Sequence, residues 1–268
     1  MKFSQHAPRG RLAPIVKTIW RARGTRAEFS APEPIVPDGC VEIVFNLADP
    51  FVGEDGTRQP RALLAGQMTR PVVALPTGDV DLLGVRFRTA RAGGALGVAM
   101  WQLQDCLLDA SAVMPGLDHL ADDLRGIPDD HRLDHLERAL PMSGVDGRTG
   151  DIDHALALLE AADGNVTVEA IARRVGITRR HLERRFKDEV GLGVKQMARI
   201  ARVHAALRLM ACNREISGAE ISAHCGYSDQ AHLIRECKAL TGQTPARLTT
   251  SSRSLAGLMR EGAGARSA

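Results

Sequence analysis

The chain has 268 residues, of which 44% are hydrophobic and 25% charged, with a formal net charge of +3. This length is sufficient for two domains with cores of their own. No stretch approaches 18 apolar residues and residues 1–10 lack a signal-peptide core, which excludes a membrane-spanning protein and predicts a cytoplasmic one. The five cysteines form no CxxC pair and no zinc-ligand spacing, so we expect reduced thiols, no metal and no cofactor.

The N-terminal part, about residues 1–140, has strand patterns first and helix patterns later. Strands are expected in the apolar runs 41–47, 62–67 and 72–75 and in the alternating segment 83–88. After Arg91 the spacing becomes helical, with Leu117, Leu120, Leu124, Leu133, Leu136 and Leu140. These patterns predict a small β-rich domain followed by helices.

Three features of this part could bind a ligand, but a simpler interpretation is favoured for each. Arg86 and Arg88 could meet an anionic effector, although a solvated strand face is the better prediction. Cys40 could sense redox state, yet carboxylates two residues away on either side should raise its pKa, which favours a structural role. The three histidines between 119 and 135 include an i, i+4 pair on a polar helix, and solvation is favoured over metal binding.

Two segments predict irregular structure. Residues 141–150 are rich in glycine and polar side chains, as in a flexible linker. Residues 251–268 are rich in Ser, Gly, Ala and Arg and predict a disordered tail.

Residues 151–250 contain one supersecondary unit twice. Leu182, Arg184, Phe186, Lys187 and Gly191 recur 51 residues later as Leu233, Arg235, Cys237, Lys238 and Gly242. Upstream the offset is 50, which pairs Ile171 with Ile221 and Gly176 with Gly226, so the second copy has one extra residue after its turn glycine. Each unit consists of a helix, a glycine turn and a second helix, which is the layout of a helix-turn-helix.

Local signals give the bounds of these helices. In the first copy, helices are expected at 168–175 and 179–190, with Gly176 ending the first and Thr178 capping the second. In the second copy we expect Ser228 to cap a helix reaching about Leu240, and Pro245 to prevent a helix from resuming. Residues 194–211 predict one helix that would hold the two units at a fixed separation; successive major grooves of B-DNA lie ~34 Å apart.

The outward face of each second helix suits DNA. Between residues 173 and 187 there are seven Lys or Arg and one acid, a density that favours phosphate contacts. Residues 151–250 carry 15 basic against 12 acidic side chains, and residues 1–150 carry 17 against 19. The side chains expected at DNA are Arg179, Arg180, Glu183, Arg184, Lys187, Gln230, His232 and Arg235. Arg can read guanine, Gln adenine and Glu cytosine. A solvated basic face would explain a lone cluster, but its duplication favours DNA reading.

Residues 151–250 resemble the DNA-binding domain of the AraC/XylS family of bacterial transcription regulators. The resemblance rests on Gly226-Tyr227-Ser228-Asp229-Gln230-Ala231-His232-Leu233, followed by Arg235, Lys238, Gly242 and Thr244-Pro245. The one-residue difference between the copies also matches the family. The chain departs from it at Cys237 and Leu233, where aromatic residues are common, and at Val194, where the first copy often has Pro.

The segments Pro37-Asp38-Gly39-Cys40-Val41-Glu42 and Gly66-Gln67-Met68-Thr69-Arg70-Pro71 resemble an uncharacterised N-terminal domain attached to many regulators of this family. That resemblance implies a sensory or dimerising domain of a cupin-like barrel type.

We therefore expect an α+β protein with a β-rich domain at 1–140, a linker at 141–150, two helix-turn-helix units at 151–250 and a tail at 251–268. Its expected function is bacterial transcription regulation through double-stranded DNA, with activation or repression left open. A small-molecule effector, a homodimer and, for an activator, RNA polymerase remain open as partners. The alternatives are a DNA-repair alkyl transferase and an architectural DNA-binding protein without an effector. No cysteine lies in a Pro-Cys-His-Arg sequence and no HExxH, GxSxG or P-loop pattern is present, so we expect no enzyme.

Overall fold

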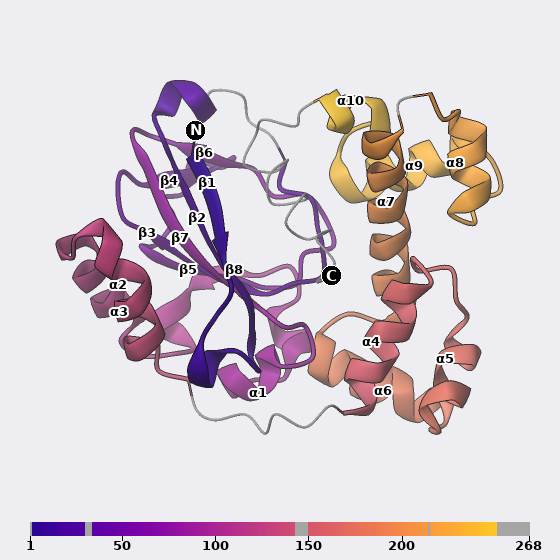
Figure 1. The fold of residues 1–268 in the computed structure, drawn as a ribbon, viewed down its shortest axis with the longest axis horizontal. Helices are drawn as coiled ribbons and strands as arrows, with labels where there is room; N and C mark the ends of the chain where they lie inside the picture. The colour runs from indigo at the N-terminus through magenta and orange to yellow at the C-terminus, as the bar shows by residue number, and fades with distance from the viewer. Residues whose placement is uncertain (1, 30–33, 143–149, 214, 251–268) are drawn as a thin grey trace.

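The N-terminal part of the molecule is a sheet domain and the C-terminal part is helical (Figure 1), as expected for an α+β chain. The structure is a computed structural model that describes residues 2–29, 34–142, 150–213 and 215–250. A six-stranded antiparallel sheet has the order β1-β2-β7-β3-β5-β8, and β4 pairs with β6 in a second sheet. The strands are β1 (Lys2–His6), β2 (Val16–Gly24), β3 (Glu42–Asn46), β4 (Phe51–Gly53), β5 (Ala62–Ala65), β6 (Ala74–Pro76), β7 (Val80–Phe87) and β8 (Leu107–Asp109). The larger sheet is open, with β1 and β8 at its edges.

Apolar side chains cover both faces of the larger sheet. One face packs against α1 (Ala92–Leu96), α2 (Leu117–Gly126) and α3 (Arg132–Ala139). Of the helical leucines expected after Arg91, Leu133 is partly buried there and the others are buried. The other face forms a smaller core around Trp20 and Phe51. Short 3-10 helices connect these elements: η1 (Gly10–Leu12), η2 (Arg26–Phe29), η3 (Met100–Leu103), η4 (Ala110–Ala112) and η5 (Asp129–His131).

The central strand β7 corrects one expectation. Gly84 and Arg86 were expected on a half-buried, solvated strand face, but both are buried, and Arg86 is 4% exposed. The reason is that β7 lies between β2 and β3 and has a core on each side. Gly84 also has no room for a side chain, because the Trp20 ring occupies the position of a Cβ atom.

One residue of the predicted linker lies in the core. Met142 is 7% exposed and belongs to the same apolar cluster as Leu136 and Leu140, whereas Pro141 before it is exposed. Residues 143–149 and 251–268 lie outside the described residues, and Gly150 is the N-cap of α4.

The C-terminal helices reproduce the predicted repeat. They are α4 (Asp151–Ala161), α5 (Val168–Val175), α6 (Arg179–Val190), α7 (Val194–Cys212), α8 (Gly218–His224), α9 (Gln230–Thr241) and α10 (Pro245–Thr250). Helices α5 and α6 form the first unit, α8 and α9 form the second, and α7 joins them (Figure 1). The bounds of α5 and α6 agree with the prediction, and α7 is one residue longer.

Matched positions of the two units have matched environments. Leu182 and Leu233 are buried, as are Phe186 and Cys237. The turn residues Gly176 and Gly226 both have positive φ angles, of 81° and 71°. The extra residue of the second unit lies in its turn, between Gly226 and the first residue of α9, as the offset predicts.

Two predictions about the second unit were wrong. Asp229, rather than Ser228, is the N-cap of α9, and its Oδ1 accepts a hydrogen bond from the backbone N of His232 at 2.6 Å. The extra turn residue moves the cap position one step along the chain. Pro245 does not prevent a helix but begins α10, because the first position of a helix needs no amide hydrogen and suits the fixed φ of proline.

The two parts of the molecule are in contact. His204 Nε2 on α7 lies 2.8 Å from the carbonyl oxygen of Pro37, and Arg91 donates to Asp153 Oδ2 at 2.8 Å. In the described ranges, no helix combines the length and the apolar character that crossing a membrane requires.

Candidate nucleic-acid interface

The outward face of α6 is formed by basic side chains. Arg180, Arg184 and Lys187 are exposed, whereas the opposite face buries the residues of the core. The side chain of Thr178 accepts a hydrogen bond from His181 N at 3.2 Å and so fixes the first turn. Arg184 Nη2 lies 3.3 Å from the His181 Nδ1 atom, which holds the guanidinium along the helix. The face presents positive charge in a fixed orientation.

Arg179 and Glu183 lie on the same helix but are engaged with each other. Arg179 Nε donates to Glu183 Oε1 at 3.0 Å, and its Nη1 donates to Glu169 on α5. The hydrogen bond to Glu183, together with the charge of Glu169, raises the pKa of Arg179. The bond to Glu169 joins α5 to α6, and both exposed bonds would have to rearrange before Arg179 or Glu183 met a base.

The predicted side chains of the second unit, Gln230, His232 and Arg235, lie in the first half of α9. The Gln230 side chain packs against Gly218, where a Cβ atom would lie 2.5 Å from Gln230 Cδ. The His232 ring meets Tyr227 edge-on at 5.3 Å, and its Nδ1 lies 3.2 Å from Ser228 Oγ. Arg235 and Gln230 are exposed, whereas His232 is half-buried.

Helix α7 and the interhelical loops hold the two units together. Arg199 on α7 donates to both carboxylate oxygens of Glu236 on α9, at 2.8 and 3.2 Å. Arg208 makes an ion pair with Asp163 beside the first unit. The turn of the second unit touches the first, since a Cβ atom on Gly226 would lie 2.7 Å from Asn165 Oδ1. The separation of the outward faces is fixed by these contacts.

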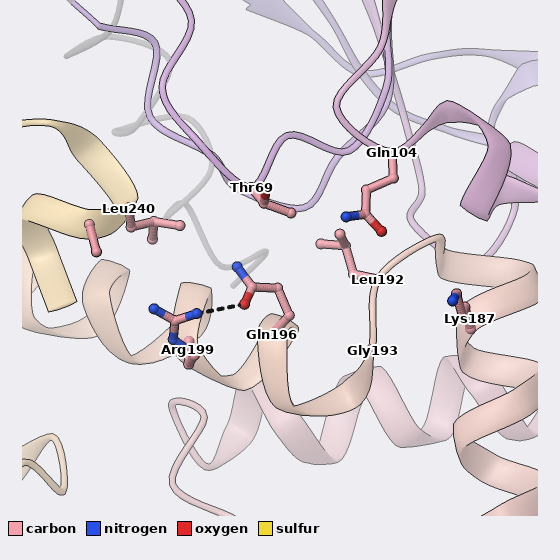
Figure 2. A pocket seen from close by; sticks show the side chains of 9 residues that line it. Thr69, Gln104, Lys187, Leu192, Gly193, Gln196, Arg199 and Leu240 are labelled. Atoms are coloured by element: carbon pink, nitrogen blue, oxygen red, sulfur yellow. Dashed lines mark hydrogen bonds between the residues drawn. The ribbon is translucent and has the colours of Figure 1, made fainter.

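Lys187 also faces the N-terminal part. It lines a cavity of about 450 Å³ that is shared with Thr69 and Gln104 from the sheet domain and with Gln196 and Arg199 from α7. Figure 2 shows Thr69 and Gln104 on the opposite side of this cavity from Gln196, which accepts a hydrogen bond from Arg199 at 2.8 Å. The C-terminal ends of α6 and α9 therefore meet the sheet domain at this cavity.

A cluster of buried charged residues lies in the sheet domain, next to its contact with α7 at Pro37. Arg86 is bonded to Glu42, its direct neighbour across β3 and β7, and lies 3.1 Å from Asp38 Oδ2. Burial, then the negative charge of Asp38, raises the pKa of Cys40 to about 12. This raised pKa agrees with a structural role for the thiol. Sequence reasoning missed the pairing, although Glu42 is the charged residue of β3 and Arg86 is one of two charged residues in β7, the other being Asp81.

Two of the three histidines considered for metal binding are solvated, whereas His135 is half-buried and its Nε2 atom has no hydrogen-bond partner among the described residues. The side chains of His119 and His131 are 86% and 69% exposed. Across the ranges that the structure describes, no three His, Cys, Asp or Glu side chains gather as metal ligands.

Comparison with known proteins supports the repeat. A family model described as a helix-turn-helix domain matches residues 171–251, and a domain of unknown function matches residues 4–109. The HTH-type transcriptional regulator GlxA of Rhizobium meliloti (strain 1021) is 33% identical over 122 residues. Residues 171–251 are therefore similar to helix-turn-helix domains of transcription regulators. The match to GlxA covers 43% of this chain and 37% of that regulator, so the chain spans little more than a third of the curated relative.

Two solved structures of bacterial proteins are similar to the chain as well. A regulator with an AraC-type DNA-binding domain from Chromobacterium violaceum is 27% identical, covers 39% of this chain and 93% of its own, and has a TM-score of 0.36. ToxT of Vibrio cholerae is 8% identical, covers 93% of this chain and 98% of its own, and has a TM-score of 0.47.

Proposed function

We propose that this protein is a sequence-specific bacterial transcription regulator of the AraC/XylS type, whose α6 and α9 read adjacent major-groove segments of double-stranded DNA. One observation carries the proposal: Arg184 and Arg235 are exposed at matched positions of two units that α7 and its ion pairs hold together. An arginine on an exposed helix face can bind guanine with two hydrogen bonds.

The remaining predicted side chains have different roles in this proposal. Arg180 and Lys187 stand beside Arg184 on the outward face and would contact phosphates, which position the protein without reading sequence. Gln230 and His232 would contact bases or the backbone near the start of α9. Arg179 and Glu183 would orient the first unit through their mutual hydrogen bond and would reach DNA only after it opens.

Selection of bound sequences from a random DNA pool tests whether both helix-turn-helix units read bases. The full chain, Arg184→Ala and Arg235→Ala are compared, with Arg138→Ala as a control that removes an exposed arginine from α3. Each reading variant should lose preference at one position, at a cost of roughly 1–3 kcal/mol, while the control keeps every preference. The two affected positions should lie about 10 base pairs apart. Should Arg235→Ala leave all preferences unchanged, the second unit would serve only as a clamp on the backbone.

Lys187 has a separate test. Lys187→Ala should weaken binding to all sequences alike and lower the slope of log K against log salt by about one unit. A loss confined to one base position would show a base contact instead.

The sheet domain would control this binding, through an effector or through a second copy of the chain. Support comes from its contacts with α7 at His204, with α4 at Asp153 and with the end of α6 around Lys187. Mapping the bound sites across the genome identifies the neighbouring genes, and their transcripts in a deletion strain separate an activator, which would also contact RNA polymerase, from a repressor. Light scattering of the full chain, alone and on its selected site, measures the number of copies bound.

A further inference from the structure

A cleft lies between the first helix-turn-helix unit and α7, the helix that joins the two units. Its volume is about 480 Å³. The first unit contributes Thr167, Glu169 and Arg179 to its walls, and α7 contributes Lys195, Arg199 and Arg202. The cleft is near the starts of both reading helices, because Arg179 begins α6 and Arg202 reaches Tyr227 just before α9. It therefore lies beside the first unit, and Arg202 extends from it to the second unit.

Two of the four cations in this cleft have no carboxylate partner. Arg179 is paired with Glu169, and Arg199 is paired with Glu236. Among the residues that the structure describes, neither Lys195 nor Arg202 makes an ion pair. Glu169 is engaged by Arg179, and the charge of nearby Lys195 is only a minor cause of its lowered pKa. Lys195 is exposed, so its ammonium group is available to a ligand.

Arg202 is held in place by an aromatic ring. Its guanidinium carbon lies 5.4 Å from the centre of the Tyr227 ring, and Tyr227 is only 5% exposed. A cation over an aromatic face is attracted by the ring without being neutralised by it. The Arg202 Nε atom is buried and has no hydrogen-bond partner within the described structure. The side chain is thus oriented by the second unit while it lines a cleft against the first.

We propose that this cleft binds the DNA backbone between the two major-groove segments, with Lys195 and Arg202 each contacting a phosphate. This rests on the proposed function, since it needs α6 and α9 to lie on one duplex. The two residues are seven positions apart on α7, a rise of about 10 Å. Duplex DNA carries one negative charge per ~1.7 Å of its axis, so two unpaired cations on the helix that joins the units would meet phosphates whichever bases are read. Helix α7 then serves as a third contact with DNA as well as a spacer.

The salt dependence of binding tests this proposal. Dissociation constants for the selected DNA site are measured over a range of KCl concentrations with the full chain, Lys195→Ala and Arg202→Gln. Lys2→Ala, which removes an exposed lysine from β1, is the matched control for net charge. Each cleft variant should lower the salt slope by about 0.9 and the double variant by about 1.8, because one counterion-releasing contact is lost per cation. The control should keep the wild-type slope, and the base preferences of all variants should be unchanged.

Arg202→Lys separates charge from packing. It keeps the cation, so it should restore the salt slope that Arg202→Gln loses, even where the weaker stacking on Tyr227 lowers thermal stability. If Lys195→Ala and Arg202→Gln both keep the wild-type slope, or either changes a base preference, the proposed phosphate contacts are wrong. If the full chain itself selects no sequence from a random pool, the proposed function fails, whereas normal selection with unchanged slopes overturns the role of α7 alone.

Discussion

Gly191 offers a direct test of the contact between the sheet domain and the first reading unit. It ends α6 with a φ of 86°, and a Cβ atom there would lie 2.7 Å from Gln67 Oε1 and 2.7 Å from the backbone oxygen of Met100. Gly176 is a matched control, because its φ is 81° and nothing lies within 4 Å of its Cβ position. Alanine at either glycine introduces the same left-handed strain, and only Gly191→Ala also clashes with the sheet domain.

The structure gives the size of the difference. The left-handed conformation should cost an alanine about 1–2 kcal/mol at both positions. A Cβ atom 2.7 Å from a backbone oxygen requires movement of the main chain, and overpacking of a filled site adds ~1–3 kcal/mol. This extra cost is limited by the free energy of the interdomain contact, since separating the two parts removes the clash. Gly242→Ala should resemble the control, because Pro71 Cγ lies at an ordinary 3.5 Å from its Cβ position.

Urea unfolding of the full chain measures the three free energies. Gly191→Ala should be the least stable of the three variants, and hydrogen exchange should rise at the backbone amides of residues 100–103. Equal destabilisation by Gly191→Ala and Gly176→Ala, with unchanged exchange, would refute the packing of Met100 and Gln67 against the end of α6.

Three further predictions concern stability. Cys237 is 0% exposed in a filled core, so Cys237→Phe should lower the midpoint of thermal unfolding through an overpacking cost of ~1–3 kcal/mol, and a rise would instead indicate a void. Asp229→Ala removes the N-cap of α9 and should cost about 1 kcal/mol in urea unfolding, against less than about 0.5 kcal/mol for Ser228→Ala; equal costs would contradict the cap assignment. Burial would raise the pKa of Asp81, but hydrogen bonds from Arg23 and Arg132 prevail and hold it below its usual value. The stability from this lowered pKa is present above the unfolded pKa of about 3.9 and is lost as pH falls through the folded pKa, so Asp81→Asn should destabilise the chain at pH 7 and approach wild type near pH 2.

The first reading unit could be predicted closely because its structure is determined by neighbouring residues. Gly176 can adopt the left-handed conformation that ends α5, and the Thr178 hydroxyl caps α6, so each boundary has a local cause. The cap of α9 was harder to predict, because Ser228 and Asp229 are both good N-cap residues and the extra turn residue decides between them. Pro245 was ambiguous for a similar reason, since proline ends a helix from within and begins one at its first position.

The environment of Arg86 could not be predicted from its own strand. Its partner Glu42 is 44 positions away, and the two meet only through the antiparallel register of β3 and β7. The alternation of apolar and polar residues along one strand shows which residues share a face of the sheet. It does not show whether a second core covers the face that carries the polar residues. The same holds for Lys187, whose position beside Thr69 and Gln104 depends on how the sheet domain packs against the helices.

The places where the sheet domain touches the reading units bear on how it could control them. Its loop at residues 66–71 meets the glycines that end both reading helices, with Gln67 at Gly191 and Pro71 at Gly242. The outward side chains Arg184 and Arg235 remain exposed in the same structure. A domain that acted as a simple cover would bury those side chains, whereas this one contacts the end of each helix. A change in the loop would therefore act first on the angle and spacing of α6 and α9, and so on the fit of the two units to successive major grooves.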